Sequence, residues 1–288
     1  MVRIVSFSPK GDTRMSQETQ PAEMTKKPVL CQIPGMDAVS VRRDIEYRTA
    51  ATGPLTMDLY RPPDSKSARL PAVIFVSGYS DVGLQAFLGC KLKDWEAYIS
   101  WGKLTAASGL VAITYSATEP TADLPALLQH IRQNAASLGI DEHRIGLWGC
   151  SGNGPMTLST LMQESSLKCA VLCYGYTLDL DGATGVAEVA KTYGFANPCA
   201  GKSVADLPQE TPLFLVRAGQ DQLPHLNETM DRFLLQALAR NLPVTLANHA
   251  AGPHAFDLLH DSETTREIIR QILAFLRFHL STKSASFR

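Results

Sequence analysis

The chain has 288 residues, of which 45% are hydrophobic, and a formal net charge of −1 from 27 basic and 28 acidic residues. This length allows one large α/β domain with a sizeable core. The balanced charge creates no field that would attract nucleic acid or an anionic membrane surface. No apolar run approaches the roughly 18 residues that span a bilayer. We therefore expect neither nucleic acid nor a membrane as a partner.

The first 35 residues are polar and show no periodicity, which predicts a mobile tail ahead of one domain over residues 36–288. They contain no basic segment followed by an apolar core and a small-residue cleavage site, so we expect no signal peptide. The six cysteines form no C-x-x-C pair, and their even number is weak evidence for disulfides in a chain of this length. We therefore expect a cytoplasmic protein.

The pattern of apolar residues predicts an α/β fold. Two alternating segments form a half-exposed hairpin at a sheet edge, and continuous apolar runs then alternate with helical segments. This order indicates a mostly parallel central sheet with helices on both faces. The hairpin covers residues 39–47 and 54–60, the buried strands 70–76, 110–115, 145–148, 169–173, 212–216 and 244–247, and the helices 123–138, 228–240 and 267–280.

Two long connections interrupt this alternation, at residues 79–102 and 175–209. Both follow predicted strand ends, where open α/β sheets bind their ligands, and connections of this length often serve as lids or binding loops. The second is a candidate cap or lid with one short helix near residues 186–191. The first is rich in aromatic residues, and we expect Tyr79, Trp95 and Trp101 to contact substrate.

A short apolar run leads into a glycine-rich turn at residues 149–154, and an apolar helical segment follows at once. A strand, a sharp turn and a helix around Ser151 are the context of a nucleophile elbow. The pattern G-x-S-x-G is incomplete, because Asn153 occupies the fifth position and Gly154 follows it. A helix-capping serine in a glycine-rich turn is the alternative interpretation.

A serine nucleophile needs a base, and the base needs an orienting acid. Asp221 follows the strand at residues 212–216, and His254 lies in a glycine–proline loop after the strand at residues 244–247. Serine, acid and histidine thus occur in the chain order that is typical of enzymes with a nucleophile elbow, and each follows its own strand. Asp257 is a rival acid, and His249 and His260 are rival bases.

Cys150 precedes the expected nucleophile. A cysteine nucleophile would replace the serine at the centre of the motif, whereas Cys150 lies one position early. We expect its side chain to point into the core and to act in packing.

Three segments carry a family resemblance: residues 149–152, 218–221 and 252–257 are similar to the elbow, the acid loop and the histidine loop of α/β-hydrolases of the dienelactone-hydrolase and acyl-esterase kind. The resemblance covers roughly residues 40–280. It implies the α/β-hydrolase fold and hydrolysis of an ester of a small or medium acyl group by a Ser-His-Asp triad, without a metal or cofactor.

The same resemblance implies an oxyanion hole. One donor is the N–H of Gly152, the residue after the nucleophile. The other comes from the loop after the strand at residues 70–76, where we expect Tyr79 to donate through its N–H, with its phenol as an alternative. Relatives often have His-Gly in this loop, whereas this chain has Ser77 and Gly78.

Other functions stay open. The same triad serves acyltransferases, thioesterases and amidases. Asn153 and Ser77 also allow a non-catalytic protein that binds a small molecule, and the sequence allows a homo-oligomer. The chain contains no H-E-x-x-H motif, no close Cys/His cluster and no phosphate-binding glycine loop, so neither a metal nor a nucleotide is expected.

Overall fold

The first two strands form the predicted hairpin at one edge of the sheet. The computed structural model describes residues 21–63, 65 and 69–281. Within them, β1 (Ser40–Ala50) pairs antiparallel with β2 (Gly53–Arg61). β1 is largely exposed because it has a neighbour on one side only, which explains its alternating pattern.

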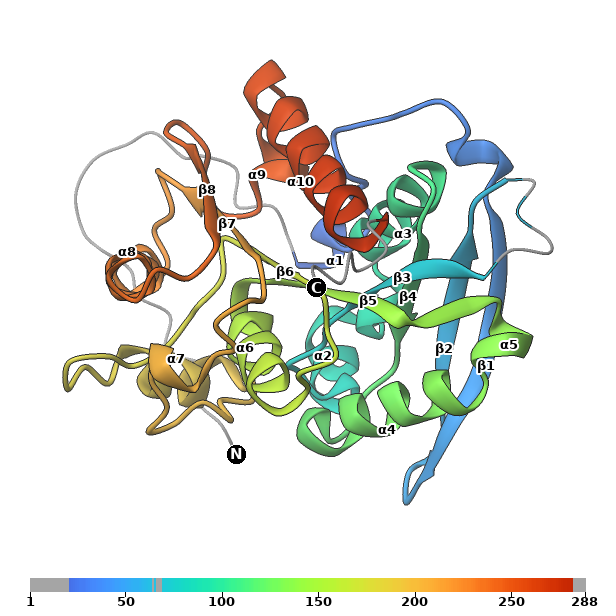
Figure 1. Ribbon diagram of the computed structural model, residues 1–288, viewed down its shortest axis with the longest axis horizontal. Coiled ribbons are helices and arrows are strands. Elements are labelled where there is room, and N and C mark those ends of the chain that lie inside the picture. Colours follow the sequence, from blue (N-terminus) through green and yellow to red (C-terminus); the bar gives the residue numbers. More distant parts are fainter. Residues whose placement is uncertain (1–20, 64, 66–68, 282–288) are drawn as a thin grey trace, which may run out of the picture.

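Six further strands extend the sheet from this hairpin in the order β1-β2-β4-β3-β5-β6-β7-β8 (Figure 1). β2 pairs antiparallel with β4, and every later pair is parallel. The mostly parallel sheet is therefore confirmed. These strands are β3 (Leu70–Phe75), β4 (Val111–Tyr115), β5 (Ile140–Cys150), β6 (Ala170–Cys173), β7 (Leu213–Ala218) and β8 (Val244–His249).

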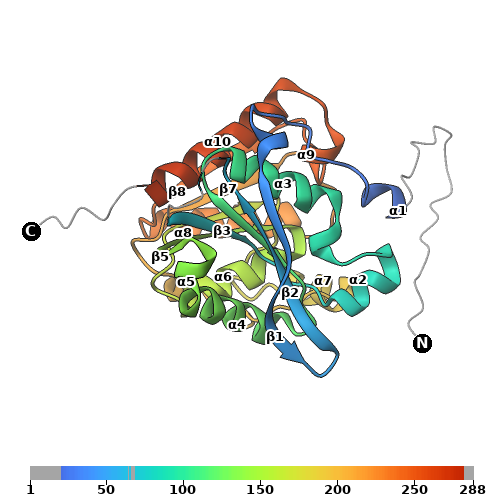
Figure 2. The same cartoon turned by 90° about the vertical axis from the view of Figure 1, so that its right-hand side faces the viewer.

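Helices cover both faces of the sheet, as Figures 1 and 2 show. α3 (Glu96–Ala107) and α10 (Glu263–Ser281) pack on one face, and α4 (Pro120–Gln133) and α6 (Gly154–Gln163) pack on the other. None of the helices in the described part of the chain is long and apolar enough to cross a membrane. The other α-helices are α1 (Pro21–Met24), α2 (Asp81–Leu88), α5 (Ala135–Leu138), α7 (Gly185–Tyr193), α8 (Leu226–Ala239) and α9 (Phe256–Leu259).

The connection at residues 79–102 contains helices rather than an extended loop. It holds α2 and most of α3. The sequence pattern does not reveal α3, because this helix is buried on several sides: Trp101 is 1% exposed, and Gly102 packs against the ring of Tyr60. A helix buried in this way shows no alternation of an apolar face and a polar face. The short helix expected near residues 186–191 is present as α7.

The N-terminal segment is packed onto the domain from residue 21, although the sequence predicted a mobile tail up to residue 35. Val29 and Cys31 are buried in the core. The N–H of Val29 donates to Ser100 Oγ at 2.9 Å, and the N–H of Leu30 donates to the carbonyl of Asp257 at 2.8 Å. Residues 1–20, the rest of the predicted tail, lie outside the described residues.

Candidate active site

Ser151 occupies a strained turn between β5 and α6. Its φ is +52°, a left-handed conformation that a non-glycine residue rarely adopts. The close approach of neighbouring chain segments maintains this turn. A Cβ atom on Gly149 would lie 2.1 Å from Thr157 Oγ1, and one on Gly154 would lie 2.0 Å from the carbonyl oxygen of Tyr176. Strain of this kind persists where the surroundings impose it and is frequent at active sites.

Asn153 does not distort this turn, because Gly154 makes the close backbone contact. The Asn153 side chain is 2% exposed and joins the elbow to two other elements. Its Oδ1 accepts from the N–H of Gly78 at 2.7 Å, and its Nδ2 donates to the hydroxyl of Tyr98 at 2.9 Å. The residue that departs from the motif therefore fixes the loop after β3 against the elbow.

We expect Asn153→Gly, which restores the glycine of the motif, to destabilise the protein. The substitution leaves the buried N–H of Gly78 without its acceptor, a loss that costs about 1–3 kcal/mol. Urea unfolding of both proteins measures the difference. Asn153→Asp keeps an acceptor for Gly78 but loses the donor to Tyr98 and buries a carboxylate, so we expect it to be destabilised as well at neutral pH. Equal stability of Asn153→Gly and the wild type would contradict this role.

Asp221 and His254 are brought together by the loops after β7 and β8. His254 Nδ1 lies 2.6 Å from Asp221 Oδ2, and the other carboxylate oxygen of Asp221 accepts from the N–H of Leu223 at 2.9 Å. The side chain of Asp221 is fully buried. A hydrogen bond from the N–H of Gln220 to the carbonyl of Gly252 ties the two loops to each other. A buried carboxylate of this kind can hold one tautomer of the imidazole.

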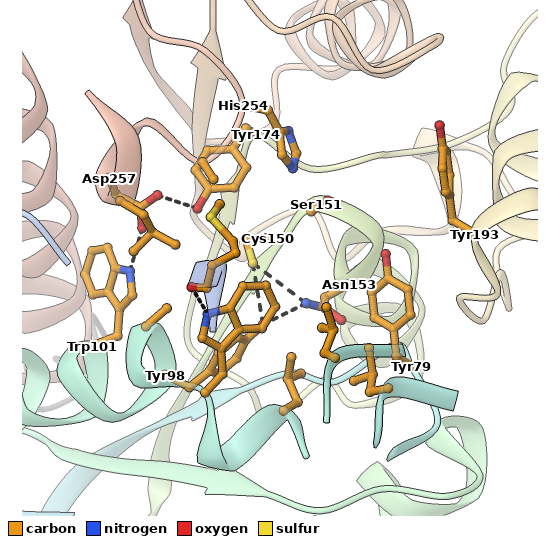
Figure 3. A pocket seen from close by; sticks show the side chains of 18 of the residues that line it. Tyr79, Tyr98, Trp101, Cys150, Ser151, Asn153, Tyr174, Tyr193, His254 and Asp257 are labelled. Carbon is orange, nitrogen blue, oxygen red and sulfur yellow. Dashed lines mark hydrogen bonds between the residues drawn. The ribbon is translucent and has the colours of Figure 1, made fainter. Parts of the chain in front are cut away.

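Ser151 and His254 line the same cavity, and Figure 3 shows the imidazole of His254 beside Ser151. In the part of the chain that the structure describes, no hydrogen bond joins their side chains. Such contacts are often long in proteins without substrate and shorten in the reacting complex. The geometry therefore joins His254 to Asp221 and brings His254 to the cavity that Ser151 lines.

The rival residues lie elsewhere or have other partners. His249 is 2% exposed, and its Nε2 lies 3.1 Å from Thr265 Oγ1 and 3.3 Å from His260 Nδ1. Neither histidine lines the cavity. Asp257 does line it, but its carboxyl group accepts hydrogen bonds from Trp101 and Tyr174.

The loop after β3 places the phenol of Tyr79 over the elbow. A Cβ atom on Gly152 would lie 2.3 Å from the hydroxyl oxygen of Tyr79. The ring of Tyr79 also packs edge-on against Phe195 at 5.9 Å, and the N–H of Ala196 donates to the carbonyl of Gly78 at 2.7 Å. Burial raises the pKa of the Tyr79 phenol well above its usual value. The hydroxyl group thus stays protonated and can donate a hydrogen bond at neutral pH.

The sequence predicts that the side chain of Cys150 points into the core, and this prediction is wrong. The side chain lines the cavity, where its Sγ lies 3.5 Å from the hydroxyl of Tyr98 and 3.7 Å from Asn153 Nδ2 (Figure 3). Burial raises the pKa of the Cys150 thiol to about 12. A neutral thiol is a poor nucleophile, so packing remains the function that fits Cys150.

The cavity beside Ser151 has a volume of about 450 Å³, within the range of small-molecule sites. The three aromatic residues expected at the substrate, Tyr79, Trp95 and Trp101, all line it. Sequence reasoning missed Met24, which lines the cavity from the N-terminal segment. Only the three-dimensional packing of that segment reveals it.

Asp257 is a buried carboxyl group in the cavity wall. It is 1% exposed, its Oδ2 accepts from Trp101 Nε1 at 2.8 Å, and its Oδ1 accepts from the hydroxyl of Tyr174 at 2.6 Å. Burial raises its pKa above the usual value of a carboxyl group. Tyr174 also packs edge-on against His254 at 5.0 Å. Asp257 therefore joins α3 and the end of β6 behind the catalytic histidine candidate.

The raised pKa of Asp257 predicts a pH-dependent stability difference. The group contributes its full stability below its unfolded pKa of about 3.9 and loses it as the pH rises through the higher folded value. Asp257→Asn does not titrate, and its amide can accept from Trp101 and donate to Tyr174. We therefore expect the free energy of unfolding of the variant, relative to wild type, to increase from about pH 4 to about pH 8. Urea unfolding at both pH values tests this, and a decrease would contradict it.

Among the described residues, no group of three or more histidine, cysteine, aspartate or glutamate side chains is arranged to hold a metal ion. The geometry of the site rests instead on the serine, the Asp221–His254 pair and the phenol of Tyr79.

No protein-family model matches the chain, and no curated protein matches it. Solved structures do share its fold. An esterase from Pyrobaculum calidifontis is 20% identical, with a TM-score of 0.62 over 90% of this chain and 88% of that one. A bacterial heroin esterase is 16% identical, with a TM-score of 0.65 over 88% of each chain. Esterase Est2 from the Planctomycetes species Thermogutta terrifontis is 17% identical, with a TM-score of 0.63 over 88% of this chain and 97% of that one. The chain therefore has the α/β-hydrolase fold.

Proposed function

We propose that this chain, whose fold is that of the α/β-hydrolases, is a serine hydrolase that cleaves carboxylic esters of small or medium acyl groups. One observation carries the proposal. A serine in a strained elbow and a histidine bonded to a buried aspartate open into the same cavity. Proteins of similar fold that are named esterases support the same chemistry.

The proposed reaction begins with attack of Ser151 Oγ on the ester carbonyl carbon. His254 Nε2 takes the hydroxyl proton as the new C–O bond forms, and the N–H at His254 Nδ1 donates to Asp221 throughout. When the bond to the alcohol breaks, the imidazolium returns the proton to the leaving alkoxide. Water then attacks the acyl-enzyme with His254 as base, which releases the acid and restores Ser151.

The developing oxyanion is held by two donors in this proposal. The N–H of Gly152 is one, and the phenol of Tyr79 is the other, because its hydroxyl lies over Gly152 and stays protonated. Fixed donors of this kind stabilise charge in the transition state without reorganisation. The hydrogen bond from Gly78 to Asn153 and the contact with Phe195 hold the loop that carries Tyr79.

A comparison of leaving groups tests the proposed ester preference. The same butyryl group is offered as a p-nitrophenyl ester, as a thioester and as an anilide, and kcat/KM is measured for each. An added alcohol detects acyl transfer, because transfer of the butyryl group to this alcohol forms a new ester that can be measured. We expect hydrolysis of the oxygen ester to be fastest. A faster thioester or anilide, or predominant transfer to the alcohol, would assign the triad to one of the other reactions.

A further inference from the structure

The wall of the cavity beside Ser151 is largely apolar and aromatic. Met24, Leu92, Trp95, Tyr98, Trp101 and Leu258 contribute to it. The rings of Trp101 and Trp148 lie 5.2 Å apart, and those of Trp95 and Tyr98 lie 6.3 Å apart, both tilted. Packed aromatic walls bind flat or ring-shaped apolar groups through large contact areas.

In the described part of the chain, the cavity offers no fixed positive charge to an anionic group. No lysine, arginine or glutamate of the described residues lines it, and Asp257 is its only carboxyl group. The carboxyl oxygens of Asp257 already accept from Trp101 and Tyr174. A carboxylate on the substrate would lose its water here without gaining a counter-ion, and burial of an unpaired charge is strongly unfavourable.

The N-terminal segment completes this wall. Trp95 Nε1 donates to the carbonyl of Met24 at 2.9 Å, and the N–H of Glu96 donates to the carbonyl of Thr25 at 2.9 Å. These two bonds join the segment to the start of α3, and the bond from Leu30 to Asp257 joins it to α9. The side chain of Met24 is half-buried against the core and lines the cavity.

Resting on the proposed ester hydrolysis, we propose that the substrate is an ester without an anionic group, with an aromatic or alicyclic ring on one side of the ester bond. The ring occupies the aromatic wall beside Ser151, and Met24 limits the size of the ring that fits. The N-terminal segment is therefore a specificity element for this site.

A panel of esters tests the substrate class, with each kcat/KM divided by the rate constant for alkaline hydrolysis of the same ester. Methyl acetate, methyl phenylacetate and methyl cyclohexanecarboxylate vary the acyl side, and ethyl, benzyl and cyclohexyl acetates vary the alcohol side. Monomethyl succinate supplies an anion. We expect at least one ring ester to exceed its small counterpart by about tenfold or more in kcat/KM, since one methylene in an apolar pocket already changes this ratio by about 10–200-fold. We expect the anionic ester to fall below that ring ester by a similar factor.

The outcomes separate this inference from the proposed function. Equal rates for ring esters and small esters, or preference for the anionic ester, would overturn the inference while ester hydrolysis stands. Absence of turnover with every ester would overturn the proposed function itself.

Substitutions at Met24 test the specificity element. We expect Met24→Trp to lower kcat/KM for the preferred ring ester by about tenfold and to leave the small ester within a factor of about two. Met24→Ala should shift the preference to larger rings, such as a naphthyl group. Lys26→Ala, an exposed position in the same segment, is the control and should change neither. Equal effects on ring esters and small esters in both Met24 variants would contradict the assignment.

Discussion

Ser151→Ala is expected to lower kcat for ester hydrolysis by about 10⁴–10⁶-fold, the loss typical of removing a triad nucleophile. The variant keeps the fold, because alanine loses only the hydroxyl group. The turn itself is maintained by the glycines at residues 149 and 154. Turnover of a p-nitrophenyl ester measures the loss, and circular dichroism checks the fold.

His254→Ala should lose nearly as much activity as Ser151→Ala, and the double variant little more, because members of one triad act as a unit. Ser80→Ala is the matched control. Ser80 lines the same cavity, and its side chain does not cap α2. Retained activity in both Ser151→Ala and His254→Ala would reject the triad.

Tyr79→Phe is expected to lower kcat by about 10²–10³-fold, the usual cost of one oxyanion donor. KM should change little, because the ring remains in the wall and only the transition state loses a hydrogen bond. Tyr193→Phe is the control, since Tyr193 lines the same cavity but is 47% exposed. Unchanged kcat in Tyr79→Phe would remove the phenol from the mechanism and leave the N–H of Tyr79 as the second donor.

The sequence predicted those parts of the fold that depend on local pattern. β1 alternates because it is largely exposed at the sheet edge, and the central strands are apolar because helices cover both of their faces. α10 shows its apolar stripe because only one of its faces is buried. The positions of Asp221 and His254 after separate strands follow from the topology of a parallel sheet.

Features that depend on distant contacts could not be predicted in this way. α3 is buried on several sides, and Gly102 looks like a break although it allows contact with Tyr60. The segment at residues 21–35 is held by the burial of Val29 and Cys31 and by hydrogen bonds to residues distant in sequence, such as Ser100 and Asp257, which leave no mark in a local pattern. Its polar composition suggested a tail for this reason.

The elbow also contains one residue, Asn153, whose role depends on distant contacts and could not be predicted from the sequence pattern. Asn153 seemed a departure from the motif, because a pattern compares residue types and not their contacts. In the structure Gly154 makes the close approach, while Asn153 accepts from Gly78 and donates to Tyr98. Cys150 faces the cavity for a related reason, since its thiol packs beside Tyr98 and Asn153.

The most direct test of the central claim is covalent labelling with a fluorophosphonate probe, followed by mapping of the adduct by peptide mass spectrometry. The proposed mechanism predicts one adduct, on Ser151, that is absent in Ser151→Ala and strongly reduced in His254→Ala. The folded protein left unlabelled, or labelled at another residue, would contradict the assignment of Ser151 as an activated nucleophile.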